Sequence, residues 1–137
     1  MTDFTSEVKT IPYNDGSVFA LLSDLSKLEG FRERIPEDTF KNVLFERDGC
    51  SFDIHPAGKV EFRIVDREPN RTIKFQTVHS PVPMYIRIQL KPESRTLTKM
   101  KMTLEADLNP LLKPMLSKPI QEAVDRISTL IATLPYE

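Results

Sequence analysis

The chain has 137 residues, 19 basic and 20 acidic side chains, and a formal net charge of −1. This length fits one domain, expected to span residues 1–137, that buries enough apolar surface to fold without disulfides. The balanced charge argues against nucleic acid as a partner. The lone Cys50 excludes an internal disulfide, and the N-terminus lacks the regions of a signal peptide. These features predict a cytoplasmic protein without stable membrane insertion.

The N-terminal part of the chain predicts one strand and two short helices. Residues 4–10 alternate loosely between apolar and polar side chains, which predicts a strand that the following proline ends. Asn14 or Asp15 can then cap a helix, because its side-chain oxygen can accept a hydrogen bond from a free N–H of the first turn. Apolar residues at helical spacing predict that this helix ends at Gly30. A second short helix is expected over residues 31–35.

Six alternating segments follow, separated by turn residues. They cover residues 43–45, 50–55, 60–64, 73–79, 84–91 and 98–108. Asp48-Gly49 is a strong hairpin signal between the first two. Alternation with period two gives each strand one solvent-exposed face and one buried face. Connections this short favour an antiparallel meander.

The last segment predicts one long amphipathic helix with an irregular start. Asn109 is the expected cap and Pro110 the first helical residue, where a missing N–H costs nothing. An apolar stripe continues from there to the end of the chain. Pro114 and Pro119 each remove a helical hydrogen bond, so the helix is expected to kink, or to restart near Ser117. A segment interrupted in this way could act as a gate.

The order of these elements, together with three short stretches, resembles the START-like, or Bet v 1-like, superfamily (SRPBCC proteins), which includes polyketide cyclases and lipid-transfer domains. The stretches are Ile11-Pro12, Leu22-Ser23-Asp24-Leu25 and Ala106-Asp107-Leu108-Asn109-Pro110. The resemblance covers nearly the whole chain. It implies an α+β helix-grip fold, in which a curved seven-stranded antiparallel sheet wraps around a long C-terminal helix in the order β-α-α-β6-α. It also implies a deep cavity for a hydrophobic ligand, and it transfers no catalytic residue, metal or cofactor.

The candidate ligand-binding residues lie on the inward faces of the predicted strands and at the irregular start of the last helix. They are Phe62, Phe75, Thr77, His79, Met84, Ile86, Met100, Met102, Leu112 and Met115. Methionine suits a wall that adapts to varied apolar shapes. For any single position, a simple core residue is the stronger interpretation, and the cavity itself follows from the resemblance.

Few polar residues are candidates for chemistry. His79 continues an inward face and could orient a ligand or move a proton, although a histidine pointing into water is the favoured alternative. His55 is expected in solvent, and no carboxylate lies near either histidine at metal-ligand spacing. Cys50 is expected to be a small buried residue rather than a nucleophile. Tyr85 falls on the outward face.

Three functions remain open. The leading hypothesis is binding of a small hydrophobic molecule, such as a lipid or a polyketide-like compound, for transport or sequestration. The second is a cyclase or hydratase type of enzyme that uses the same cavity, with His79 and Tyr85 as acid and base. The third is a protein-interaction module with a filled core. The sequence leaves the ligand's identity and the oligomeric state undetermined.

Overall fold

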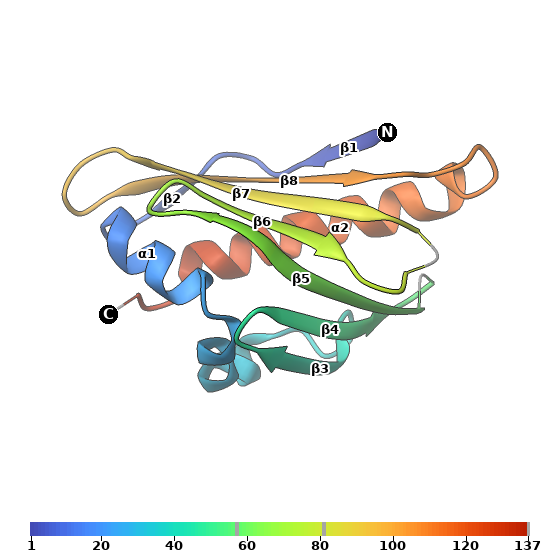
Figure 1. Cartoon of the computed structure of the whole chain (residues 1–137), viewed down its shortest axis with the longest axis horizontal. Helices are drawn as coiled ribbons and strands as arrows, with labels where there is room; N and C mark the ends of the chain where they lie inside the picture. Colours follow the sequence, from blue (N-terminus) through green and yellow to red (C-terminus); the bar gives the residue numbers. More distant parts are fainter. Residues whose placement is uncertain (57, 81, 137) are drawn as a thin grey trace.

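The computed structural model describes residues 1–56, 58–80 and 82–136. Its strands are β1 (Thr2–Thr5), β2 (Lys9–Ile11), β3 (Lys41–Glu46), β4 (Gly49–Ile54), β5 (Gly58–Glu68), β6 (Thr72–Thr77), β7 (Met84–Pro92) and β8 (Thr98–Ala106). Its helices are α1 (Asp15–Leu22), the 3-10 helix η1 (Leu25–Arg34) and α2 (Lys113–Thr133). Figure 1 shows the strands side by side as one curved sheet, with α2 running along its length.

The described strands form one antiparallel sheet in the order β1-β8-β7-β6-β5-β4-β3, and β2 also pairs with β8. From β3 to β8 each strand pairs with the next one in the chain, so the predicted meander is confirmed. The meander begins with the predicted hairpin, but its two-residue turn is Arg47-Asp48 rather than Asp48-Gly49, because Gly49 already pairs with Glu46 as the first residue of β4. The predicted α+β helix-grip fold, a curved sheet around a long C-terminal helix, is confirmed as well.

The predicted first strand is divided into β1 and β2, which brings the described sheet to eight strands rather than seven. Ser6 lies in the gap between them and is buried. Its backbone N–H donates to the carbonyl of Met102 at 2.8 Å, and its hydroxyl oxygen accepts from the N–H of Met102 at 2.9 Å. The serine side chain therefore replaces a backbone acceptor, so the strand can bend without leaving a buried N–H unpaired.

The first helix is shorter than predicted. Asn14 caps it as expected, accepting from a first-turn N–H at 2.8 Å. The helix ends at Leu22 rather than Gly30, because Asp24 begins a new turn instead of continuing the old one. The Asp24 carboxylate accepts from the backbone N–H and the hydroxyl of Ser26, at 3.1 and 2.5 Å. Such local hydrogen bonds compete with helix propagation. The chain then forms η1, which includes most of the second predicted helix.

The last helix also begins later than predicted. Asn109 accepts from the two N–H groups that follow Pro110, at 2.9 and 3.0 Å, and so caps a turn over residues 110–112 that leads directly into the helix. Helix α2 itself begins at Lys113, which places Pro114 in its first turn. Pro119 lies inside an uninterrupted helix, so a restart at Ser117 is wrong. The Ser117 hydroxyl instead donates to the carbonyl of Lys113 at 2.5 Å.

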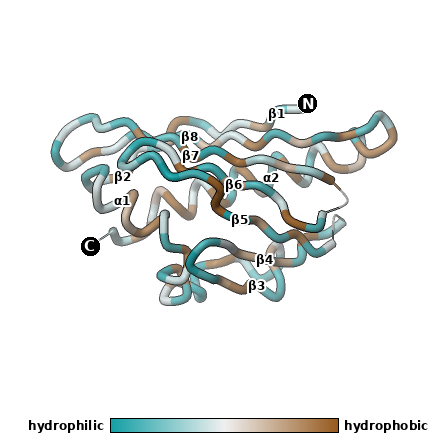
Figure 2. The backbone as a smooth tube through the Cα atoms, viewed as in Figure 1, coloured by the Kyte–Doolittle hydropathy of each residue, from teal (hydrophilic) through white to brown (hydrophobic). Residues whose placement is uncertain are grey.

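The core lies between the concave face of the sheet and α2. Figure 2 shows hydrophobic residues along the strands and hydrophilic residues in the connection between β7 and β8. Val124 on α2 and Ile73 on β6 are completely buried. At the end of the chain Tyr136 is buried and donates its hydroxyl hydrogen to the carbonyl of Ile131 at 2.5 Å. The sheet and the C-terminal half of α2 therefore form a well-packed frame.

Candidate ligand cavity

A cavity of about 380 Å³ lies between the sheet, α2 and η1. This volume falls within the range of about 300–1,000 Å³ that is typical of small-molecule sites. One part of the wall is aromatic. Phe52 packs edge-on against Phe40, with ring centroids 5.3 Å apart, and stacks on Phe62 at 6.2 Å. All three rings line the cavity.

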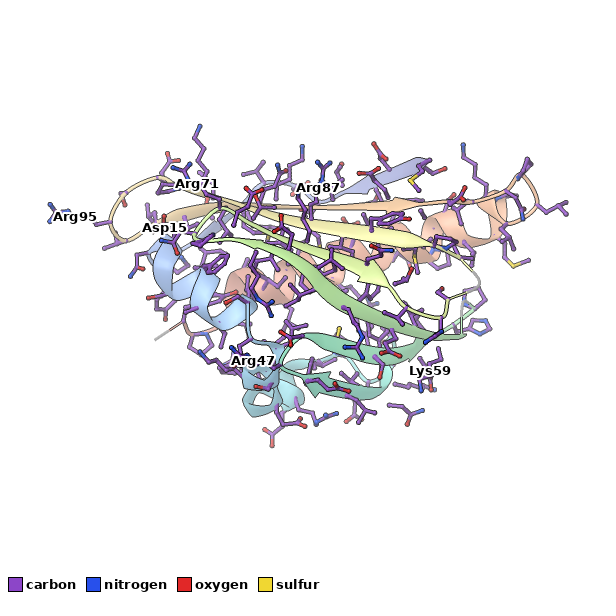
Figure 3. All side chains as sticks on the ribbon, in the orientation of Figure 1. Asp15, Arg47, Lys59, Arg71, Arg87 and Arg95 are labelled. Carbon is purple, nitrogen blue, oxygen red and sulfur yellow. The ribbon has the colours of Figure 1, made fainter. Side chains whose placement is uncertain are left out.

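The lining contains almost no polar side chain. Among the described lining residues only Cys50, His55 and Ser80 carry one. The Ser80 hydroxyl donates to the carbonyl of Val82 at 2.8 Å and accepts from its N–H at 3.2 Å, so it is already used within its own loop. The arginine and lysine residues labelled in Figure 3 are all exposed. A charged group placed deep in this cavity would therefore lose its hydration and gain no partner.

Among the lining residues that the structure describes, Cys50 is the one titratable side chain away from the cavity mouth. It is half-buried on β4 and lines the cavity. Burial, with a smaller contribution from the charge of Glu61, raises the pKa of the Cys50 thiol to about 12. The thiol is therefore neutral at physiological pH and lacks the thiolate character of a nucleophile.

Seven of the ten predicted residues line this cavity. They are Phe62, Phe75, Met84, Ile86, Met102, Leu112 and Met115. Met100 is only 1% exposed but is not part of the lining. It lies opposite Lys9, where β2 pairs with β8, and belongs to the buried core. The sequence did not distinguish lining from core positions, because both show the same inward alternation. A role of the seven in binding remains a prediction.

Thr77 and His79 do not line the cavity. The Thr77 hydroxyl accepts from the N–H of Met84 at 2.9 Å and donates to its carbonyl at 3.4 Å, which closes the β6–β7 connection. Strand β6 ends at Thr77, so the alternation used to place His79 inward does not apply. His79 adopts a left-handed conformation, with φ of 53°, and is exposed. The inward position is therefore wrong, and the favoured alternative of a histidine pointing into water agrees with the structure.

The mouth of the cavity is marked by the lining residues that are also exposed, which are His55, Pro56 and Met115. His55 and Pro56 follow β4, and Met115 lies in the first turns of α2. Both segments lie at the same end of the molecule (Figure 1). His55 is exposed as predicted, but its place at the mouth went unrecognised.

Sequence reasoning also missed the part of the wall that η1 and β3 provide. Phe31 and Phe45 line the cavity from these elements, as Ile127 does from α2. The apolar stripe that contains Ile127 was recognised, but as a core-facing stripe. No pattern in the sequence indicated that η1 would fold back toward it.

Comparisons with known proteins support the fold assignment. No family model matches the chain, and no curated protein matches it in sequence. A START superfamily protein from Mycobacterium smegmatis is 11% identical, with a TM-score of 0.70 over 95% of this chain and 94% of that one. Norcoclaurine synthase from Thalictrum flavum, solved with dopamine and hydroxybenzaldehyde, is 9% identical, with a TM-score of 0.72 over 96% and 84%. A conserved protein from Geobacillus kaustophilus is 16% identical, with a TM-score of 0.67 over 96% and 93%.

These likenesses and the helix-grip architecture define the class: the chain has a START-like, or Bet v 1-like, fold. In the described residues, no group of three or more His, Cys, Asp or Glu side chains is arranged to hold a metal ion. The same part of the chain contains no helix that is long and apolar enough to span a membrane.

Proposed function

We propose that this protein binds a small hydrophobic molecule, such as a lipid or a polyketide-like compound, in the cavity between the sheet and α2, for transport or sequestration. The observation that carries the proposal is an apolar cavity of about 380 Å³ that reaches the surface. A ligand that buries about 300 Å² of apolar surface gains roughly 7 kcal/mol at 25 cal/mol per Å². Before the cost of association this gain corresponds to a Kd of about 10 μM, and that cost shifts the expected Kd toward the millimolar range.

The start of α2 is the proposed gate. Pro119 has no N–H, so the carbonyl of Met115 lacks its helical donor. Leu112, Met115 and Pro119 all line the cavity, and Leu111 beside them is 85% exposed. A helix end with one hydrogen bond fewer opens more readily than the buried half that follows.

Replacing Pro119 with alanine tests this gate. The new N–H can bond to the carbonyl of Met115, so we expect slower ligand release, by about fivefold for one net hydrogen bond of about 1 kcal/mol. Stopped-flow fluorescence with a bound dye measures this rate. Pro114→Ala is the matched control, since a first-turn proline removes no helical hydrogen bond. Equal release rates in wild type and Pro119→Ala would contradict the gate.

The binding proposal accounts for the cavity better than its alternatives. A cyclase or hydratase needs an acid and a base beside the substrate, but His79 and Tyr85 do not line the cavity. An interaction module with a filled core leaves the cavity unexplained. Norcoclaurine synthase, with the same fold, was solved with two small aromatic molecules, which supports a small organic ligand. The proposed compartment is the cytoplasm, where a free Cys50 thiol stays reduced.

Fluorescence titration with N-phenyl-1-naphthylamine, a neutral apolar dye, tests the proposal directly. We expect saturable binding of one dye per chain, with a Kd between about 10 μM and 1 mM. Native mass spectrometry of the protein from its own host should show excess mass that denaturation releases, and fragmentation of that mass identifies the ligand. No saturable dye binding, together with an apo mass, would refute the proposal.

A further inference from the structure

A second hollow, of about 290 Å³, adjoins the mouth of the cavity. The two hollows share three lining residues, Ile54, His55 and Pro56. Their chemistry differs sharply. Apart from Gly58, the other lining residues of the second hollow, called the polar cleft below, are Asp38, Thr39, Lys41 and Asp53. A molecule that emerges from the apolar cavity at His55 therefore enters a polar environment.

A bulge in β3 changes the pairing of charges in the polar cleft. Lys41 lies directly opposite Asp53 across the β3–β4 ladder, a position where an ion pair is expected. The register shifts between Lys41 and Leu44, and Asn42 adopts a left-handed conformation with φ of 53°. The Asn42 amide donates to the Asp53 carboxylate at 2.6 Å. Bulges redirect side chains in this way. Here Asn42, rather than Lys41, contacts the carboxylate of Asp53.

The other carboxylate of the polar cleft also has a partner. Arg126 on α2 lies 3.5 Å from Asp38 and donates to the Thr39 hydroxyl at 2.5 Å. Among the described residues, neither the Lys41 ammonium nor the His55 ring makes an ion pair or a side-chain hydrogen bond. The polar cleft therefore has two donors without a protein acceptor, and each of its two carboxylates has a partner on one oxygen.

We propose that the polar cleft is a headgroup site and that the ligand is an amphiphile with a carboxylate at one end. The apolar body lies in the cavity, and the carboxylate lies at the mouth and accepts hydrogen bonds from Lys41 and His55. This rests on the proposed function and makes it more specific. The cavity itself rejects a charged end, because its lining provides no partner for one. The polar end of a bound amphiphile therefore stays at the mouth, beside these two donors.

Two probes of equal chain length test the headgroup site. Decanoate and 1-decanol each displace N-phenyl-1-naphthylamine, and the ratio of their Kd values measures the preference for a carboxylate. We expect decanoate to bind about three- to fivefold more tightly at low salt, the range for an exposed ion pair. Lys41→Gln should abolish this preference and leave the Kd of the dye unchanged. Lys101→Gln, which removes the same charge from an exposed position on β8, should keep it.

Asn42→Gly provides a second, independent variant. Glycine tolerates the left-handed conformation, so the bulge can persist. Without the amide, Asp53 becomes available to Lys41, and the preference for decanoate should fall as it does in Lys41→Gln. If wild type binds 1-decanol as tightly as decanoate while the dye still binds, the headgroup site is refuted and the cavity proposal stands. If none of the three compounds binds, the proposed function itself fails.

Discussion

Replacing Ala123 with leucine should raise stability and weaken binding together. Ala123 lies on the inner face of α2, is 9% exposed and lines the cavity. Leucine adds three carbons that can occupy space the alanine leaves empty. Each buried methylene contributes about 0.8 kcal/mol, so the free energy of unfolding should rise by up to about 2 kcal/mol. The same atoms occupy ligand volume, and we expect the Kd of N-phenyl-1-naphthylamine to rise by tenfold or more.

Urea denaturation and dye titration measure the two effects on the same samples. Ala20→Leu on the exposed face of α1 is the control, since it makes the same change in a helix away from the cavity. It should leave dye binding unchanged. A loss of stability by about 1–3 kcal/mol in Ala123→Leu, the usual effect of overpacking, would refute the existence of usable space beside this helix. Unchanged binding would refute the location of the ligand.

Three further predictions concern buried polar groups. Burial holds the Cys50 thiol neutral, so iodoacetamide should alkylate it at pH 8 at least tenfold more slowly than it alkylates free cysteine. Intact-mass measurements follow the reaction. Alkylation at the rate of free cysteine would contradict the placement of Cys50 in the cavity wall. Burial also raises the pKa of Tyr136, so the folded state holds the phenol proton more tightly than the unfolded chain. The free energy of unfolding should thus fall as the pH rises above about 10, and Tyr136→Phe should reduce this fall in urea titrations from pH 8 to 11. Ser6→Ala leaves the buried N–H of Met102 without an acceptor and should lower the free energy of unfolding by about 1–3 kcal/mol; an unchanged urea midpoint would contradict the bridge.

The fold could be predicted because its signals are local and repeated. The alternation from Val43 to Leu108 sets the strand faces, and the short turns between strands leave only a meander. What failed depends on single side-chain contacts. The Asp24–Ser26 hydrogen bonds end a helix that its apolar stripe would continue. Ser6 divides a strand through its contact with Met102, nearly a hundred residues away in the chain.

The sequence, through its family resemblance, predicted that an apolar cavity exists, but it predicted only some of the residues that line it. Five of the seven were identified from the inward alternation of the strands, which a cavity wall and a core wall share, and Leu112 and Met115 from the irregular start of the last helix. For the same reason Met100 could not be separated from them. The positions of the two histidines depend on where β4 and β6 end, and a shift of a residue or two at a strand end turns a side chain from one face to the other. The polar cleft depends on a bulge that no composition signal marks.

Helix α2 is one continuous helix whose C-terminal half packs on the sheet and whose first turns lie at the cavity mouth. In its C-terminal half, Val124 and Ile131 are buried against the sheet, and the Tyr136 hydroxyl donates to the carbonyl of Ile131. In its first turns Met115 is 58% exposed, and Pro119 leaves one carbonyl without a helical donor. Packing and hydrogen bonding thus fall off toward the cavity mouth. Four of the six buried α2 side chains, Ala123, Val124, Ser128 and Ile131, lie from Ala123 onward, so the first turn around Met115 can open while these residues hold the helix to the sheet. In this arrangement a ligand could exchange without unfolding of the core.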